Sequence, residues 1–214
     1  MTVLKPISGG KKMLHAPSAE NAYVELVGGE RFDLNAPTFP IRSMAIALSR
    51  IPRFTGHYKE EIEHYSVLQH CLLVSTLSLN QLEGLLHDWP EAIVNDLSSP
   101  LKSQFEGYRG YEDFIYRRLG EEYGLPHVIS RETHQADMEA LVLEAHFLME
   151  SRGRDYSAYE QYSYILKQGY VITPMSAHEA FDAFRLRWAL LMEKDLYIEP
   201  WRPNIRQFTN SHPA

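Results

Sequence analysis

A histidine and an aspartate stand side by side inside an apolar segment of this 214-residue chain. His87 and Asp88 follow two leucines, and the apolar run Ala92-Ile93-Val94 comes shortly after them. Removing a carboxylate from water costs free energy that only a partner can offset. A divalent cation is the partner that suits an imidazole and a carboxylate together. If the helix that carries the pair continues through Glu91, that carboxylate lies one turn away. The run therefore predicts a metal site with an acid or base beside it.

Two further polar residues lie on predicted apolar faces of other helices. His70 has apolar residues three and four positions away, and so does Asp137. A single histidine in such a place is more often a core residue than a ligand. Asp137, however, lies too far inside its predicted helix to be a cap, so its burial needs a cation or several donors. With His87 and Asp88, these residues offer two imidazoles and two carboxylates from three helices, which leaves coordination positions open for water or phosphate.

Apolar residues recur at helical spacing along most of the chain, after a short N-terminal stretch with a different pattern. Alternation over 23–27 and 30–34, around Gly28-Gly29, predicts a small β-hairpin. Ser130 is predicted to cap a long helix, and Gly124 to end the one before it. Helices are predicted over 41–50, 66–79, 81–95, 108–123, 130–150 and 176–194. The expected fold class is all-α with a small N-terminal β-hairpin, in a single domain 1-214 whose residues 1–20 form a flexible arm.

Charge and composition exclude several classes of function. The net charge is −7 and no dense basic run occurs, which argues against binding to duplex nucleic acid. Cys71 is the single cysteine, which excludes a disulfide framework and suits a reducing cytosol. No stretch resembles a signal peptide or a membrane span. We expect a cytoplasmic protein that does not act in a membrane.

Four ordered motifs carry a resemblance to a known family. They are Tyr65-Ser66-Val67-Leu68-Gln69-His70, Leu85-Leu86-His87-Asp88-Trp89-Pro90-Glu91-Ala92, Asn95-Asp96-Leu97-Ser98-Ser99-Pro100-Leu101-Lys102 and Gln135-Ala136-Asp137. With them the chain resembles the HD-domain phosphohydrolases, and among these the 5′-deoxynucleotidases and the phage-type deoxynucleotide triphosphohydrolases. The segment 47–57 and the predicted hairpin at 29–34 are also similar to segments of the phage and prophage proteins. The likeness covers residues 24–145 and implies an HD-domain helical bundle.

The resemblance also implies a role for each matching residue. His70, His87, Asp88 and Asp137 would bind a divalent metal ion, which could be Co²⁺, Mn²⁺, Zn²⁺ or Mg²⁺. Glu91 would act beside the attacking water, and Asp96 would be the second acidic residue. On the substrate side, Arg53 would grip phosphate and Phe54 would lie beside the nucleotide, where relatives often have tryptophan. Lys102 is a second candidate for the phosphate charge, with a solvated surface lysine as the alternative, and His57 is a candidate that would otherwise be exposed in a loop.

The function implied is metal-dependent hydrolysis of 2′-deoxynucleotides. The sequence analysis favours a dNTP triphosphohydrolase, with dATP a plausible substrate, that releases deoxynucleoside and triphosphate. The phosphate tail of a bound dNTP would need cations from Arg53, Lys102 and the 109–118 segment. A 5′-deoxynucleotidase acting on dNMPs is the first alternative, and a non-catalytic nucleotide-binding scaffold is another. A cyclic-nucleotide phosphodiesterase or (p)ppGpp hydrolase fits the context of Arg53 and Asp96 less well. The expected assembly is a homo-oligomer, a dimer or higher, in the host cytoplasm if a phage encodes the chain.

Overall fold

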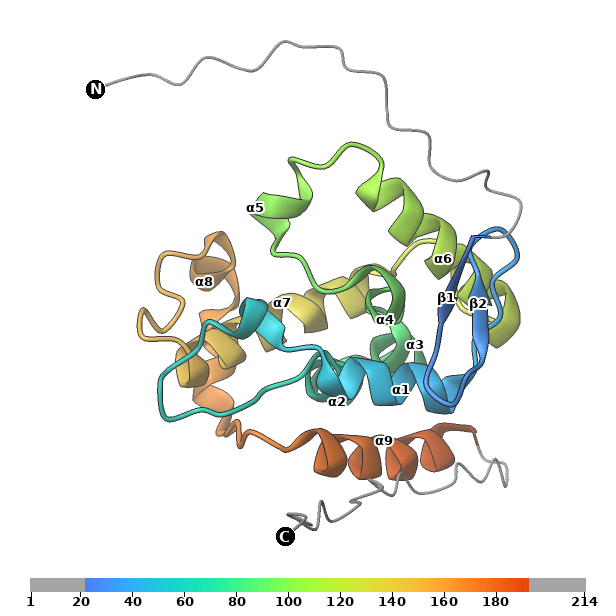
Figure 1. Ribbon diagram of the computed structural model, residues 1–214. Helices are drawn as coiled ribbons and strands as arrows, with labels where there is room; N and C mark the ends of the chain where they lie inside the picture. The colour runs from blue at the N-terminus through green and yellow to red at the C-terminus, as the bar shows by residue number, and fades with distance from the viewer. Residues whose placement is uncertain (1–21, 193–214) are drawn as a thin grey trace, which may run out of the picture.

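The computed structural model describes residues 22–192, which form a helical assembly around one central helix (Figure 1). This helix, α2 (Val67–Leu77), packs against α1 (Ile41–Arg50), α3 (Gln81–Leu86), α7 (Arg131–Leu148) and α9 (Ala177–Met192). Most of α2 is buried, which explains why its sequence is apolar on nearly every side. Among residues 22–192, no helix is long and apolar enough to cross a membrane.

The remaining elements surround this centre. They are the strands β1 (Tyr23–Glu25) and β2 (Arg31–Asp33), the 3-10 helices η2 (Arg53–Gly56) and η3 (Ser163–Gln168), and the helices α4 (Glu91–Val94), α5 (Ser99–Lys102), α6 (Tyr108–Tyr123) and α8 (Ser157–Tyr162). The strands pair antiparallel with Val24 opposite Phe32, across a turn in which both Gly28 and Gly29 have positive φ. The predicted all-α class with a small N-terminal β-hairpin is therefore confirmed. The predicted arm at 1–20 and the end of the last predicted helix lie outside the described residues.

The predicted ends of α6 and α7 are also confirmed. Gly124 follows α6 with φ 69°, a left-handed conformation that glycine adopts without strain. Ser130 caps α7, and its hydroxyl accepts a hydrogen bond from the Thr133 N–H at 3.3 Å. These two ends fix the direction of α7, the helix that carries Asp137.

One predicted element is wrong: the single helix over 81–95 is interrupted. Helix α3 ends at Leu86, and α4 begins only at Glu91. Pro90 has no N–H to donate to the carbonyl of Leu86, so that carbonyl accepts from the Trp89 N–H at 3.1 Å instead. The Glu91 N–H likewise reaches back only three residues, to the Asp88 carbonyl at 3.0 Å. His87 and Asp88 therefore lie in a tight turn between two short helices.

The turn that carries His87 and Asp88 is anchored in the hydrophobic core. Trp89 is completely buried, and its ring centroid lies 5.4 Å from that of Phe184 on α9. Phe184 belongs to the buried face of α9 with Phe181 and Trp188, which covers the core below α1 and α2 (Figure 1). An indole of this size loses several kcal/mol of stabilisation if it leaves such a core, so the turn is held in place by packing.

A buried carboxylate ties α3 to the start of α7. Glu83 accepts hydrogen bonds from the Ser130 N–H at 2.7 Å, from the Thr133 hydroxyl at 2.7 Å and from the hydroxyl of Tyr116 at 3.2 Å. Burial alone would raise the pKa of Glu83, but the bonds from Ser130, Thr133 and Tyr116 lower it below its ordinary value.

Glu83→Gln is therefore expected to destabilise the protein in a pH-dependent way. Because the pKa of Glu83 is lower in the folded than in the unfolded state, its contribution is fully present above the unfolded value and is lost as the pH falls through the folded one. We expect a loss of about 1–3 kcal/mol in the free energy of unfolding at pH 7, measured by urea denaturation. The difference from the wild type should narrow below pH 4.5. An exposed control, Glu61→Gln, should show little change, and a gap for Glu83→Gln that is constant with pH would contradict the expectation.

Candidate metal centre

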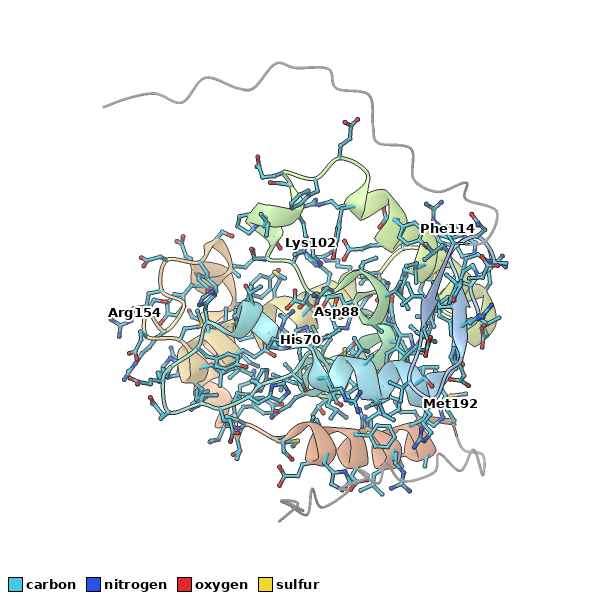
Figure 2. The ribbon with its side chains drawn as sticks, viewed as in Figure 1. His70, Asp88, Lys102, Phe114, Arg154 and Met192 are labelled. Atoms are coloured by element: carbon cyan, nitrogen blue, oxygen red, sulfur yellow. The ribbon has the colours of Figure 1, made fainter. Side chains whose placement is uncertain are left out.

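Four side chains from three separate parts of the chain converge in the interior. They are His70 on α2, His87 and Asp88 in the turn after α3, and Asp137 on α7. The Nε2 atoms of the two histidines lie 3.2 Å apart. Oδ2 of Asp88 lies 3.3 Å from each of these nitrogens, and Oδ1 of Asp137 lies 3.2 Å from His70 Nε2 and 3.9 Å from His87 Nε2. Figure 2 shows His70 and Asp88 together at the centre of the molecule, far from Arg154 at its edge.

The other ring nitrogen of each histidine is already in use. His87 Nδ1 lies 2.9 Å from the carbonyl oxygen of Gly84, which can only accept, so this nitrogen carries a proton. His70 Nδ1 lies 2.8 Å from Oε1 of Glu144, which accepts in the same way when ionised. In the neutral form of both rings, the Nε2 lone pairs therefore face each other. Two lone pairs at this separation repel unless a proton or a cation lies between them.

The spacing of the four ligand atoms fits a divalent ion. Around a cation with bonds of about 2.1 Å, neighbouring ligand atoms are separated by roughly 3.0 Å in an octahedron and 3.4 Å in a tetrahedron. Four of the separations above are 3.2 or 3.3 Å, and the fifth, from His87 Nε2 to Asp137 Oδ1, is 3.9 Å. The group whose ligand atoms all lie within 4.8 Å of one another consists of His70, His87 and Asp137, and Asp88 approaches it through the two imidazoles. The residues thus fit a metal ion by geometry as well as by donor type.

The electrostatics of the centre favour positive charge. Burial and the charge of Arg53 would lower the pKa of His70, but Glu144 and hydrogen bonds to Asp137 and Asp88 raise it well above its ordinary value. Burial would raise the pKa of Asp88, and the two histidines with Arg53 hold it far below the ordinary value. Burial would also raise the pKa of Asp137, but His70 and His87 hold it below the ordinary value. Carboxylates that keep a proton on a buried imidazole also attract a cation to the same place.

Glu91 lies next to this group without joining it. Its Oε1 accepts from Nζ of Lys102 at 2.9 Å, and Lys102 also donates to Glu112 on α6 at 2.8 Å. Glu91 Oε2 is buried and has no hydrogen-bond partner among the described residues. Burial and the neighbouring Asp88 and Asp96 raise the pKa of Glu91 well above its ordinary value, although Lys102 opposes the shift. A carboxyl group with a raised pKa and a free oxygen suits proton transfer.

Arg53 lies near the same oxygen of Asp88 that the two histidines approach. Its Nη1 is 3.7 Å from Oδ2 of Asp88 and 3.6 Å from Oδ2 of Asp96. The backbone N–H of Arg53 donates to the Tyr65 carbonyl at 2.9 Å. Burial would lower the pKa of Arg53, but the surrounding carboxylates raise it. Phe54 follows in a left-handed conformation with φ 52°, and the Arg53 guanidinium lies 5.6 Å from its ring centroid. The structure thus places Arg53 beside Asp88 and Asp96, and Phe54 beside Arg53.

His57 is the predicted site residue that the structure does not bring to the centre. It is exposed in the loop after η2, and its ring makes no hydrogen bond or ion pair with the site residues described above. Its role as a substrate contact stays a prediction. Lys102, by contrast, is not a fully solvated lysine, because its side chain is 17% exposed and forms ion pairs with Glu91 and Glu112.

A cavity of about 580 Å³ opens beside the centre, between the turn after α3 and α6. Four residues already described, His87, Asp88, Glu91 and Lys102, line this cavity. The other lining residues are Pro90, Glu112, Asp113, Tyr116, Arg117, His127, Val128 and Ile129. A volume of this size is in the range of small-molecule sites. Four carboxylates line the cavity, with Lys102 and Arg117 as the cationic side chains apart from its histidines.

Glu144 is the residue of this site that the sequence analysis missed. It lies seven residues after Asp137, on the same face of α7, and is completely buried among His70, Tyr65 and Arg53. The signal that could have found it is this spacing, because residues seven apart on a helix share a face. Burial would raise the pKa of Glu144, but His70 and Arg53 hold it below the ordinary value.

No family model matches the chain. It is 34% identical over 128 residues to YfdR, an uncharacterized protein of Escherichia coli strain K12, covering 58% of this chain and 70% of YfdR. A second uncharacterized protein, from Rhodobacter capsulatus, is 31% identical over 143 residues, which are 59% of this chain and 72% of the relative. The chain belongs to the YfdR family. Because both relatives are uncharacterized, membership of the YfdR family brings no activity with it, and the chemistry has to be argued from the site.

If the four residues hold a divalent ion, Asp88→Ala and Asp137→Ala should lose it. Each variant removes one ligand and leaves the facing imidazoles with half of their carboxylate charge. We expect Co²⁺ affinity, measured by calorimetry on metal-stripped protein, to fall by more than the roughly 10–100-fold that loss of an outer partner costs. Asp113→Ala, which removes an exposed carboxylate of the same cavity, is the matched control and should bind Co²⁺ as the wild type does. Unchanged Co²⁺ binding in both ligand variants would rule out the site.

Proposed function

We propose that this chain is a metal-dependent phosphohydrolase of the HD type that acts on 2′-deoxynucleotides. The observation that carries the proposal is the convergence of two imidazole Nε2 atoms and two carboxylates at ligand spacing. Two neighbouring groups support it further. They are Oε2 of Glu91, which has no hydrogen-bond partner among the described residues, and the guanidinium of Arg53 near Asp88. The resemblance of the ordered motifs to HD-domain phosphohydrolases supplies the substrate class.

The proposed ligands are His70, His87, Asp88 and Asp137. A divalent ion bound there lowers the pKa of a water molecule and polarises a phosphoryl oxygen. Arg53 lies beside Asp88 and balances the charge of the phosphoryl group, with Asp96 and Glu144 holding its guanidinium. Lys102 contributes a second positive charge from the other side.

Glu91 serves as the general acid or base in this proposal. Its Oε1 is held by Lys102, which leaves Oε2 to accept a proton from water or to return one to the leaving group. Glu91 is separated in role from the ligands because it is not in the group whose ligand atoms lie together, and because Lys102 holds its Oε1. The proposal therefore assigns Glu91 to proton transfer and not to metal binding.

The two candidate substrates, dNTPs and dNMPs, differ in the length of the phosphate chain that the site must hold. The sequence analysis favours a dNTP triphosphohydrolase, whose tail would need cations beyond the metal. Of the cations suggested in segment 109–118, Arg117 lines the cavity, whereas Arg118 pairs with Glu121 on the surface. Lys102 is shared between two carboxylates, and Glu112 and Asp113 would face the β and γ phosphates if the tail lay in this cavity. This acidity favours the second candidate, a 5′-deoxynucleotidase acting on dNMPs.

The proposal also includes a cytoplasmic location for the protein. The single cysteine is buried and free, as suits a reducing cytoplasm. The acidic chain is expected to act on free nucleotides as a homo-oligomer and not on duplex nucleic acid.

Product analysis tests the proposal and separates its two forms. The full chain, loaded with Co²⁺, Mn²⁺ or Mg²⁺, is incubated with each dNTP and each dNMP. A triphosphohydrolase releases deoxynucleoside and tripolyphosphate in one step, whereas a 5′-deoxynucleotidase releases orthophosphate from dNMPs alone. A chain that binds the metal and nucleotides but turns over neither class would favour the non-catalytic scaffold. Turnover of cyclic nucleotides or (p)ppGpp in place of deoxynucleotides would overturn the substrate class.

Glu91→Gln should slow turnover and leave binding intact. The amide cannot take up a proton, so kcat is expected to fall by roughly 10²–10⁴-fold, the usual effect of a positioned acid or base. Calorimetry should show wild-type affinity for Co²⁺, because Glu91 is not among the proposed ligands. Glu112→Gln is the matched comparison, since it loses the other carboxylate that holds Lys102. If both variants lose the same activity, the effect lies with Lys102 and the role of Glu91 is refuted.

A further inference from the structure

One buried carboxylate contacts two parts of the candidate site at once. Oε1 of Glu144 accepts hydrogen bonds from His70 Nδ1 at 2.8 Å and from the Tyr65 hydroxyl at 2.9 Å. Its Oε2 lies 3.5 Å from Nη2 of Arg53. The side chain of Glu144 is fully shielded from solvent, so these contacts are its entire polar environment among the described residues. Of the other carboxylates paired with Arg53, Asp88 has a side-chain exposure of 22% and Asp96 of 9%.

The two histidines differ in what stands behind them. His87 donates from Nδ1 to a neutral backbone carbonyl, whereas His70 donates to the charged Glu144. A carboxylate behind a ligating histidine fixes the ring, selects the tautomer with its proton on Nδ1 and strengthens Nε2 as a ligand. Charge-assisted hydrogen bonds are also stronger than neutral ones. The arrangement therefore makes His70 the more firmly oriented of the two imidazoles.

The same carboxylate determines where Arg53 lies. Nη1 of Arg53 is 3.7 Å from Asp88, one of the proposed ligands, so the guanidinium and a metal ion draw on the same carboxylate. Glu144, which is buried and does not line the cavity, contacts the other terminal nitrogen of Arg53, Nη2. Without this charge, Arg53 would be drawn further toward Asp88 and would compete with the cation for it.

We propose that Glu144 is a positioning residue that prepares His70 as a ligand and Arg53 as a phosphate partner, so that both depend on one buried carboxylate. This inference rests on the proposed function, because it takes His70 as a metal ligand and Arg53 as a phosphate contact. It adds a residue that lies outside the motifs of the sequence analysis. Glu144 itself touches neither metal nor substrate, and acts through the two side chains it holds.

Metal binding by Glu144→Gln tests the first half. Co²⁺ is titrated into the metal-stripped full chain and followed by calorimetry and by the visible absorption of the bound ion. We expect Co²⁺ affinity to fall by about 10–100-fold, with a shifted absorption band because the ligand field of His70 changes. Glu139→Gln is the matched control, since Glu139 is a buried carboxylate of the same helix that bonds Tyr164 and Gln135 instead. Tyr65→Phe, which leaves the carboxylate on His70, should stay within about threefold of the wild type.

Phosphate binding tests the second half. Inorganic phosphate is titrated into wild-type and Glu144→Gln protein, both saturated with Zn²⁺, so that metal affinity no longer contributes. Weaker phosphate binding in the variant is expected, because Arg53 has lost the partner that holds it. Equal phosphate affinity would overturn the link to Arg53, and equal Co²⁺ affinity with an unshifted band would overturn the link to His70.

Two further measurements distinguish a failure of the role of Glu144 from misfolding of the variant and from failure of the proposed function. If Glu144→Gln does not fold cooperatively, nitrogen–proton spectra of the Zn²⁺-loaded wild type take its place. A protected Nδ1 proton on His70 supports the inference, and an unprotonated Nδ1 overturns it. If the wild type itself binds no Co²⁺, the proposed function fails. If the wild type binds Co²⁺ and Glu144→Gln matches it, only the role of Glu144 is refuted.

Discussion

The structure depends on two buried imidazoles whose facing nitrogens repel each other unless a proton or a cation lies between them. Two imidazoles point their Nε2 atoms at each other inside a helical core, because acceptors behind them hold the opposite nitrogens. Asp88 and Asp137 add negative charge to the same small volume. Burial of such a group is unfavourable unless positive charge enters it. Arg53 and Lys102 neutralise the edges, and the space between the histidines is suited to a divalent ion.

The core and the site are built by the same segments. Helix α2 carries His70 and contacts four other helices, while the turn with His87 and Asp88 also carries the buried Trp89. Residues of opposite polarity thus alternate over a few positions, with the apolar ones directed into the core. The hydrophobic packing holds the charged groups at separations that they would not keep by themselves.

The sequence was informative wherever a pattern was local. Helical spacing placed His70 and Asp137 on buried faces, and Ser130 and Gly124 marked helix ends that the structure confirms. Pro90 carried its own signal of a break, but the apolar pattern on both sides suggested one helix. Glu144 was missed because a glutamate on a helix usually faces water, and its partners come from residues that are distant in sequence. The hydrogen bond from Lys102 to Glu112 could not be predicted from the sequence either, because it depends on how α5 is placed against α6.

The burial of Trp89 also determines which side of the site can move. His87 and Asp88 cannot shift without pulling the indole away from Phe184 and opening the core. The opposite wall is different, because α5 is a single turn with no buried residue and the segment after it exposes Phe105. Lys102 is carried by this wall and is held mainly by ion pairs. Any adjustment to ligands of different size therefore falls to the wall formed by α5 and the start of α6, while the histidine side stays a rigid reference.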